Sequence, residues 1–210
     1  MSYDLPPLRF AYHDLAPHLS AANVARHHDG IHRGYVEAVN ALLAERPECD
    51  RGVIEDVMRG LADMPADLCE RVRFEGGGHA NHQFFWKVIG PDGHDGPRGA
   101  LAAELERAFG SFAAFRDRFT AAALALPTPG WAFLALDRPV SGGLTILTLP
   151  WNDSVLPIAK PGVLTCDLWD HAWAGDLPDR AAWLETYWKI VDWRVCEYRL
   201  DGLRKGVRNL

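Results

Sequence analysis

An aspartate and a histidine stand four residues apart in the segment 166–173, at Asp167 and His171, with Trp169 between them. Carboxylate and imidazole both bind first-row transition metals, and histidine plus one carboxylate is a typical set for metals that keep open positions for chemistry. The same spacing also suits an ordinary pair of neighbours on a helix surface. The pair alone leaves both interpretations open, so other residues must decide between them.

A further histidine lies upstream, in an apolar setting. His27 and Tyr35 share one face of a predicted helix with aliphatic residues at intervals of three or four, namely Val24, Ile31 and Val39. A single histidine on an apolar face is usually a hydrogen-bonded core residue. That explanation stays open for His27 when the helix is considered alone.

A second group of histidines follows a run of three glycines, 76–78. Glycine inside a helix costs about 1 kcal/mol relative to alanine, and the cost is tolerated where another group must approach the backbone closely. His79 and His82 come next, and Phe85 and Trp86 continue the face of His82. We expect this run in a second long helix that offers a histidine to the same interior as His27.

The elements that must position these residues begin with a helix from Ser20 to about Glu45. Ser20 is a typical N-cap residue, and Gly30 offers a place for the helix to bend. A short helix near 53–61 and a second long helix over about 66–89 complete an antiparallel hairpin. Two such helices, each with a histidine directed inwards, would provide half of a metal site.

The C-terminal half begins after the segment 91–97, where two prolines and two glycines mark the predicted domain boundary. We expect two amphipathic helices, a β-hairpin, a third strand ending near Asp167 and a last helix: 98–109, 111–126, 130–136 with 144–149, 163–168 and about 178–200. The predicted fold class is α+β. An N-terminal antiparallel helical hairpin domain (1–90) precedes a C-terminal α/β domain (91–210) with mixed helices and a small three-stranded antiparallel sheet.

Composition narrows the classes of function. The chain has 210 residues, 48% of them hydrophobic, and a net charge of −6, which is typical of a soluble globular protein with a substantial core. The negative charge disfavours a nucleic-acid partner. No run approaches the roughly 20 apolar residues of a membrane span, and the first seven residues lack a signal-peptide pattern. We therefore expect a cytoplasmic protein with reduced thiols, because its cysteines are widely spaced: Cys49, Cys69, Cys166 and Cys196.

The predicted metal ligands are two residues from each half of the chain, His27, His82, Asp167 and His171. Three neutral imidazoles and one carboxylate leave a small positive charge on either a divalent or a trivalent ion. Both oxidation states of manganese or iron could then be held without burying a large unbalanced charge. Structural zinc sites rely on thiolates, and dedicated calcium sites use oxygen alone. The set therefore predicts a redox metal between two domains.

The chain resembles the iron/manganese superoxide dismutase family over nearly its whole length. The motifs that carry the resemblance occur in the family's order at compatible distances: Leu5-Pro6-Pro7-Leu8 with 15–20, His27 with Tyr35, 76–86, Phe109-Gly110-Ser111-Phe112, Gly130-Trp131 and Asp167-x-Trp169-x-His171-Ala172. The resemblance implies the fold predicted above, usually as a dimer. It also implies one manganese or iron ion per chain and the dismutation of superoxide to O2 and H2O2.

The resemblance further implies roles for single residues. The four predicted ligands take the family's ligand positions, and Tyr35 takes that of the tyrosine at the mouth of the substrate channel. Asn152 takes the place of the outer-sphere amide, one methylene shorter than the usual glutamine. Gly78 stands where iron-type members often carry a glutamine, which favours manganese. Aromatic residues that wall the family's metal pocket correspond here to Trp86, Trp131 and Trp169.

The chain departs from the family at the channel mouth and the subunit interface. Gly30 and Ile31 stand where a lysine and a histidine are common, and Leu177 replaces an arginine. Asp170 replaces the glutamate that usually reaches the partner's ligand histidine, and Ala174 replaces a tyrosine of the interface. We therefore expect a homodimer with an altered bridge at Asp170, Ala174 and Ile31, and weaker attraction of an anionic substrate after the loss of channel cations.

Two other functions stay open on the sequence alone. The same fold with a remodelled channel could oxidise a different small molecule, because function belongs to the site and not to the fold. A metal-stabilised interaction protein without catalysis is less consistent with the residues, since Tyr35 and Asn152 would have no purpose in it. Only the first hypothesis, dismutation, requires rapid turnover of superoxide.

Overall fold

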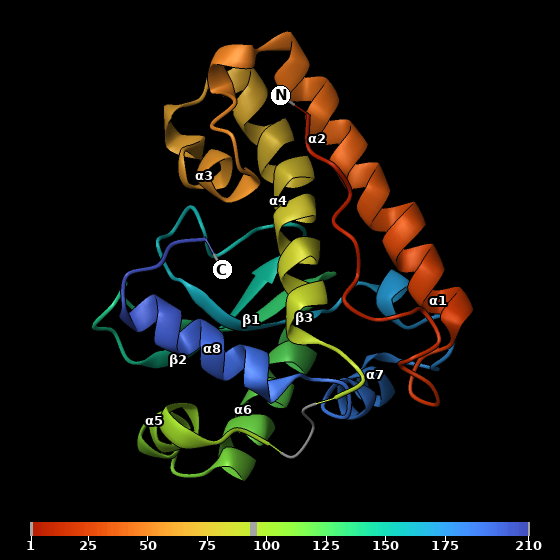
Figure 1. Ribbon diagram of the computed structural model, residues 1–210, viewed down its shortest axis with the longest axis vertical. Coiled ribbons are helices and arrows are strands. Elements are labelled where there is room, and N and C mark those ends of the chain that lie inside the picture. Colours follow the sequence, from red (N-terminus) through yellow and green to blue (C-terminus); the bar gives the residue numbers. More distant parts are fainter. Residues whose placement is uncertain (1, 93–95, 210) are drawn as a thin grey trace.

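A long antiparallel pair of helical arms forms the N-terminal part of the protein (Figure 1). The computed structural model describes residues 2–92 and 96–209. The first arm consists of α1 (Ala21–Ala25), a π-helical segment (Arg26–His32) and α2 (Arg33–Glu45). The second arm is α4 (Ala66–Val88). Along the chain, the two arms are connected by three short helices, Pro47–Cys49, α3 (Ile54–Arg59) and Leu61–Asp63.

The start of the first arm agrees with the prediction, whereas its middle does not. The Ser20 side chain accepts a hydrogen bond from the Asn23 N–H at 3.1 Å, as expected of an N-cap. Residues Arg26–His32 form a π-helical turn, which a spacing of 3.6 residues cannot foresee. Such turns are often found at functional sites. This one contains His27, so the wider turn lies where the first predicted ligand leaves the helix.

The glycine run of α4 is the place where other parts of the chain approach its backbone most closely. A Cβ atom on Gly77 would lie 2.1 Å from the Asn152 carbonyl oxygen, and one on Gly78 would lie 2.5 Å from Cδ1 of Tyr35. Both separations are shorter than any real carbon contact. The predicted reason for the glycines is therefore confirmed, because larger residues would push away two residues of the candidate site.

The sheet of the C-terminal half has three antiparallel strands, as predicted, and their order is β2-β1-β3. These strands are β1 (Gly130–Leu136), β2 (Leu144–Pro150) and β3 (Gly162–Asp167). The central strand β1 is buried throughout, and its Trp131 pairs with Asp167 of β3 and with Leu149 of β2. This register places a large aromatic residue directly beside the predicted carboxylate ligand.

Helices surround this sheet (Figure 1). They are α5 (Gly99–Phe109), α6 (Phe112–Ala125), α7 (Arg180–Tyr187) and α8 (Trp193–Arg204). The first two agree with the prediction, and Ser111 caps α6 by accepting the Ala114 N–H. The predicted boundary 91–97 contains residues 93–95, which lie outside the described residues.

The prediction of a single last helix over about 178–200 is wrong. The chain forms two helices, α7 and α8, separated by residues 188–192. This connection pairs with the end of α4, where the Gly90 N–H donates to Ile190 O and the Asp192 N–H donates to Val88 O. The Asp192 side chain then caps α8. Apolar periodicity continues across the break because Tyr187, Ile190 and Trp193 are all buried.

The core consists of two apolar clusters. The larger one surrounds the sheet and includes Trp131, Phe133 and Trp183, while the smaller one lies between α2, α3 and α4. All four cysteines are free, as predicted; Cys166 and Cys196 are buried and the other two are half-buried. Within the described ranges, no helix combines the length and apolar character that crossing a membrane requires.

Gly77→Ala is expected to lower the free energy of unfolding by about 1–3 kcal/mol, the usual cost of overpacking. The added methyl group would meet the Asn152 carbonyl oxygen at 2.1 Å, and the gain in helix propensity, about 1 kcal/mol, does not offset this clash. Urea denaturation of the metal-free protein measures the change.

Gly34→Ala is the matched control for this substitution. Gly34 lies in α2, and an added Cβ there would meet nothing within 4 Å. Alanine at this position is expected to raise the free energy of unfolding by up to about 1 kcal/mol. If the two substitutions changed stability equally, close packing at Gly77 would not be the reason for that glycine.

Candidate metal centre

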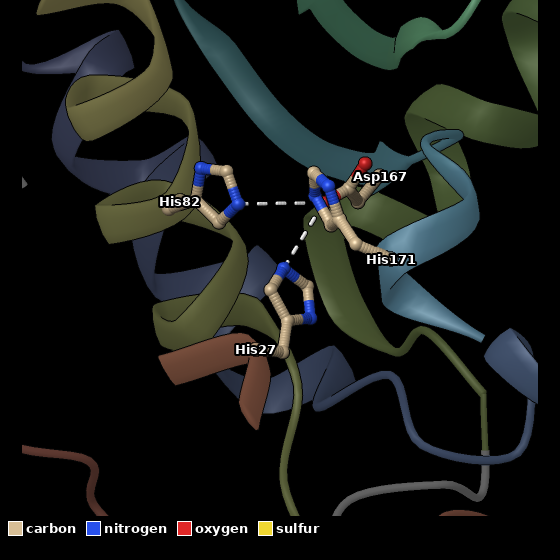
Figure 2. Close-up of side chains that lie close together, drawn as sticks. All are labelled: His27, His82, Asp167 and His171. Carbon is tan, nitrogen blue, oxygen red and sulfur yellow. Dashed lines mark hydrogen bonds and ion pairs between the residues drawn. The ribbon is translucent and has the colours of Figure 1, made fainter. Parts of the chain in front are cut away.

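Four side chains from four separate elements meet between the helical hairpin and the sheet (Figure 2). His27 comes from the π-helical turn and His82 from α4, while Asp167 ends β3. His171 lies in a short 3₁₀ helix, Asp170–Ala172. One ligand atom from each of the four lies within 4.8 Å of every other. The structure thus brings together all four residues that the sequence singled out as metal ligands.

The distances inside this group fit a single metal ion. The Oδ2 atom of Asp167 lies 3.1 Å from Nε2 of His171, 3.2 Å from Nε2 of His27 and 3.6 Å from Nε2 of His82. Metal bonds of about 2.1 Å with angles between 90° and 120° separate neighbouring ligand atoms by about 3.0–3.6 Å. The Nε2 atoms of His27 and His82 are also buried without a hydrogen-bond partner. A cation at the common centre would satisfy both nitrogens.

Burial sets the protonation of these ligands in favour of metal binding. Desolvation lowers the pKa of His27 to about 4 and that of His82 well below its ordinary value, so both imidazoles are neutral near pH 7. Burial alone would raise the pKa of Asp167, but the neighbouring His171 and His27 outweigh it and hold that pKa below its ordinary value. His27 and His82 therefore offer neutral imidazoles beside an ionised carboxylate.

Aromatic rings enclose the group. Trp86 lies 4.7 Å from the His27 ring, Trp131 lies 4.9 Å from the His82 ring, and Trp169 stacks on His171 at 5.5 Å. Trp86 and Trp131 are buried, and Trp169 is half-buried. The three indoles occupy the positions expected of pocket walls. They exclude most water from the centre, which strengthens electrostatic interactions there.

Tyr35 and Asn152 lie beside the four ligands. The Tyr35 ring is 5.3 Å from the His82 ring, and burial raises the pKa of its hydroxyl, an effect that the Asn152 amide opposes. Trp131 Nε1 donates to Oδ1 of Asn152 at 3.3 Å, which fixes the orientation of the amide. The Asn152 Nδ2 group is buried and has no hydrogen-bond partner. The effect of this amide on the Tyr35 pKa shows that it faces the Tyr35 hydroxyl. The amide therefore lies between Trp131 and Tyr35, at the edge of the metal pocket.

Hydrogen bonds to the backbone hold the ligands in place. His82 Nδ1 lies 2.7 Å from Gly78 O, which leaves Nε2 for the centre. The Trp169 N–H donates to Oδ1 of Asp167 at 2.9 Å, and Trp183 Nε1 donates to the Asp167 carbonyl at 2.6 Å. Oδ2 is thus the carboxylate oxygen that faces the three imidazoles.

Three polar residues that the sequence analysis missed connect the two halves around the centre. Asn23 Nδ2 donates to Ala172 O at 2.8 Å, and an Arg26 guanidinium nitrogen donates to His171 O at 2.9 Å. Asn81 donates to the carbonyls of the loop that carries Asn152. Their positions offered a signal, since Asn81 and Arg26 directly precede predicted ligands and Asn23 lies one helical turn before His27.

His79 is the one histidine of the glycine-rich run that does not join the centre. Its Nδ1 lies 2.9 Å from Nε2 of His32, and burial lowers the pKa of His79 to about 4. The His32 ring in turn stacks on His82 at 5.3 Å. His79 and His32 form a buried pair behind the ligand His82 and support its position.

A buried three-histidine, one-aspartate centre between a helical hairpin and a small antiparallel sheet is typical of enzymes that hold one redox-active first-row metal ion. Two family models cover most of the chain. The model of iron/manganese superoxide dismutases, alpha-hairpin domain, matches residues 2–90, and that of the C-terminal domain of the same family matches residues 97–199. The chain belongs to the iron/manganese superoxide dismutase family.

Named relatives agree with this assignment. The chain is 35% identical to superoxide dismutase [Mn] of Listeria monocytogenes over 97% of this chain and 100% of that protein. It is 36% identical to superoxide dismutase [Mn] of Pseudomonas aeruginosa over 92% and 95%. It is 39% identical to superoxide dismutase [Fe] of Raoultella planticola over 82% and 99%. The relatives thus include proteins named for each of the two metals.

The metal-free protein is expected to lose stability as the pH falls from about 6.5 to about 4. An unfolded histidine has a pKa of about 6.5, while His27 and His79 have pKa values of about 4 in the fold. In this window the unfolded chain binds protons that the folded chain does not. Each such histidine therefore lowers the free energy of unfolding by up to about 1.4 kcal/mol per pH unit.

Urea denaturation at a series of pH values measures this slope. His79→Gln is expected to reduce the slope by the share of one histidine while leaving the four residues of the centre in place. A free energy of unfolding that stays constant from pH 6.5 to pH 4 would show that these histidines are not held neutral by burial.

Proposed function

We propose that the chain disproportionates superoxide at the centre formed by His27, His82, Asp167 and His171. The observation that carries this proposal is the convergence of four buried ligand atoms within 4.8 Å of one another. A manganese or iron ion held there would supply the one-electron oxidation of superoxide to O2 and the one-electron reduction of a second superoxide. The family relationship supports dismutation over oxidation of a different small molecule.

The charge of the ligand set suits this chemistry. Three imidazole ligands, of which burial keeps those of His27 and His82 neutral, and one ionised carboxylate would leave a small positive charge on the ion in either oxidation state. A small net charge limits the cost of burying the ion in an indole-walled pocket. It also favours the approach of a small anion such as superoxide, although Gly30 and Leu177 stand where the family commonly carries cations.

Tyr35 and Asn152 are the residues that we assign to proton handling. Formation of H2O2 from superoxide requires two protons in a pocket from which most water is excluded. The raised pKa of Tyr35 keeps its hydroxyl protonated near pH 7, so this group can donate. The Asn152 Nδ2 group can donate a hydrogen bond that orients the reacting oxygen species, and Trp131 fixes its position from the other end of the amide. The second proton comes from solvent.

Manganese is the metal that we favour. The Tyr35 ring leaves no room for a side chain at position 78, because a Cβ on Gly78 would lie 2.5 Å from Tyr35 Cδ1. The amide of the pocket must then come from the C-terminal half, where Asn152 provides it. Asn152 is shorter than the usual glutamine and leaves more space around bound solvent, so iron is the alternative that reconstitution must test.

A homodimer and a cytoplasmic location stay predictions from the sequence. Asp170 and Ala174 are exposed and Ile31 is half-buried, so these residues are accessible to a partner subunit. An aspartate at position 170 reaches less far than the family's glutamate, and neither Ile31 nor Ala174 can form a polar bridge. We therefore propose an interface that depends less on the usual bridge to the partner's ligand histidine.

His171→Ala is expected to abolish tight metal binding and, with it, superoxide turnover. The substitution removes one of four ligands and leaves Asp167 without its nearest imidazole. Tyr35→Phe is the matched control, since it removes only a hydroxyl outside the ligand set and is expected to retain the metal while slowing turnover. Metal analysis by mass spectrometry and a superoxide assay measure both. Full metal content in the His171 variant would exclude it as a ligand.

Reconstitution with each metal tests the choice between manganese and iron. Metal-free protein is loaded with manganese or with iron, and superoxide turnover is measured per bound ion. We expect the manganese form to be the more active, because the amide is supplied by Asn152 while position 78 is glycine. Greater activity of the iron form would overturn the preference for manganese. Negligible turnover in both forms would overturn the proposed reaction itself.

A further inference from the structure

Trp151 combines an unusual backbone conformation with an unusual exposure. Its φ angle is 53°, in the left-handed region that bulky residues rarely adopt, and 48% of its surface is exposed. Such a conformation costs of order 1–3 kcal/mol and persists where the surrounding structure enforces it, often at a functional site. Trp151 directly precedes Asn152, the residue whose amide lies in the metal pocket.

Two ring contacts connect Trp151 with the metal centre. The Trp151 ring lies 5.9 Å from the Trp169 ring, and Trp169 stacks on the ligand His171 at 5.5 Å with an angle of 11° between the planes. Trp169 Nε1 also donates a hydrogen bond to the Trp151 carbonyl at 3.3 Å. The indoles of Trp169 and Trp151 thus form a short row from the centre to the surface.

Among the described residues, no other aromatic neighbour of the centre leads to an indole as exposed as that of Trp151. Trp131 and Trp86 contact His82 and His27, but both indoles are buried, and their contacts with Phe85 lead into the core. A second contact of Trp86, with His28, leads to the half-buried Tyr12, and the half-buried Tyr35 contacts His82 directly. Phe74 contacts Trp169 and is 39% exposed. Its phenyl ring is much harder to oxidise than an indole. Within the described part of the chain, the row through Trp169 ends at an exposed, oxidisable ring.

We infer that Trp169 and Trp151 carry oxidising equivalents away from the centre, and that Trp151 is the residue oxidised when the centre reacts with hydrogen peroxide. This inference rests on the proposed function, whose product is the peroxide. It assigns Trp151 as a site of oxidative modification and Trp169 as the connecting ring. The path diverts damage from the ligand His171 and from the buried pocket walls.

The electrons and protons of this step balance. Reduction of hydrogen peroxide to two waters consumes two electrons and two protons. One electron would come from a reduced metal ion held by the four ligands, and the other from the Trp151 indole through Trp169. The oxidised indole releases its Nε1 proton to water and becomes a neutral radical, so one further proton from solvent completes the second water. Dissolved O2 then converts this radical into an oxygenated tryptophan, the stable product that peptide mapping detects. The exposure of Trp151 allows this proton loss, which the buried Trp131 and Trp86 cannot match.

Peptide mapping by mass spectrometry after peroxide treatment tests the inference. Protein loaded with iron, protein loaded with manganese and metal-free protein are each treated with hydrogen peroxide, and oxidation is measured at every tryptophan. We expect several-fold more oxidation at Trp151 in at least one loaded form than in the metal-free form. Tyr198, which is 67% exposed and absent from the ring contacts around the centre, reports general oxidation and is expected to remain unchanged.

The variant Trp151→Phe distinguishes two roles of Trp151: electron transfer through its indole, and steric shielding of Trp169. Phenylalanine retains an aromatic ring but resists oxidation, so oxidation is expected to move to Trp169 and His171 in the loaded variant. If Trp151 only shields Trp169 from solvent, oxidation of Trp169 and His171 should be the same with tryptophan or phenylalanine at position 151. Metal content and the thermal midpoint of the variant show whether it is loaded and folded.

Three results would overturn the inference: equal oxidation of Trp151 with and without metal, an unmodified Trp151 in both loaded forms, or an unchanged oxidation pattern in the Trp151→Phe variant. Superoxide turnover measured on the same samples separates this inference from the proposed function. Metal-dependent oxidation of Trp151 without turnover would refute dismutation alone, and turnover with an unmodified Trp151 would refute the path alone.

Discussion

Burial of one carboxylate charge among three imidazoles is the constraint on which the rest of the structure depends. Asp167 is completely enclosed, and the three imidazole nitrogens that face its Oδ2 atom lie at 3.1, 3.2 and 3.6 Å. A buried charge is tolerated only when it is paired or coordinates a metal. Because desolvation keeps His27 and His82 neutral, the arrangement is incomplete without a cation. A first-row metal ion satisfies the carboxylate and the imidazoles together.

Separate parts of the chain must meet for this arrangement to form, and the packing shows how they do so. The glycine run of α4 admits Tyr35 from the first arm and the Asn152 carbonyl from the C-terminal half, with no room for side chains. The pairing of Trp131 with Asp167 across β1 and β3 places an indole where it holds the Asn152 amide. The contacts that pack the two halves together are therefore also the contacts that form the pocket.

Much of this was predictable because the signals were local or repeated. Ser20 at the start of the first arm, the apolar strands and the Asp167–His171 spacing each carry their own physical reason, and the glycine run at 76–78 predicted close approach. The break between α7 and α8 was not predictable, since it depends on hydrogen bonds between 188–192 and the end of α4. The π-helical turn at His27 was likewise not predictable from a helical spacing. The positions of Asn23, Arg26 and Asn81 next to predicted ligands offered a signal, but the carbonyls that they contact belong to distant segments and only the fold identifies them.

Anomalous X-ray diffraction from crystals of the metal-loaded protein, collected at the manganese or iron absorption edge, tests the central claim most directly. The account predicts one strong peak per chain, bonded at about 2.0–2.2 Å to Nε2 of His27, His82 and His171 and to Oδ2 of Asp167. A peak at any other place, or a peak from which one of these four side chains points away, would contradict it.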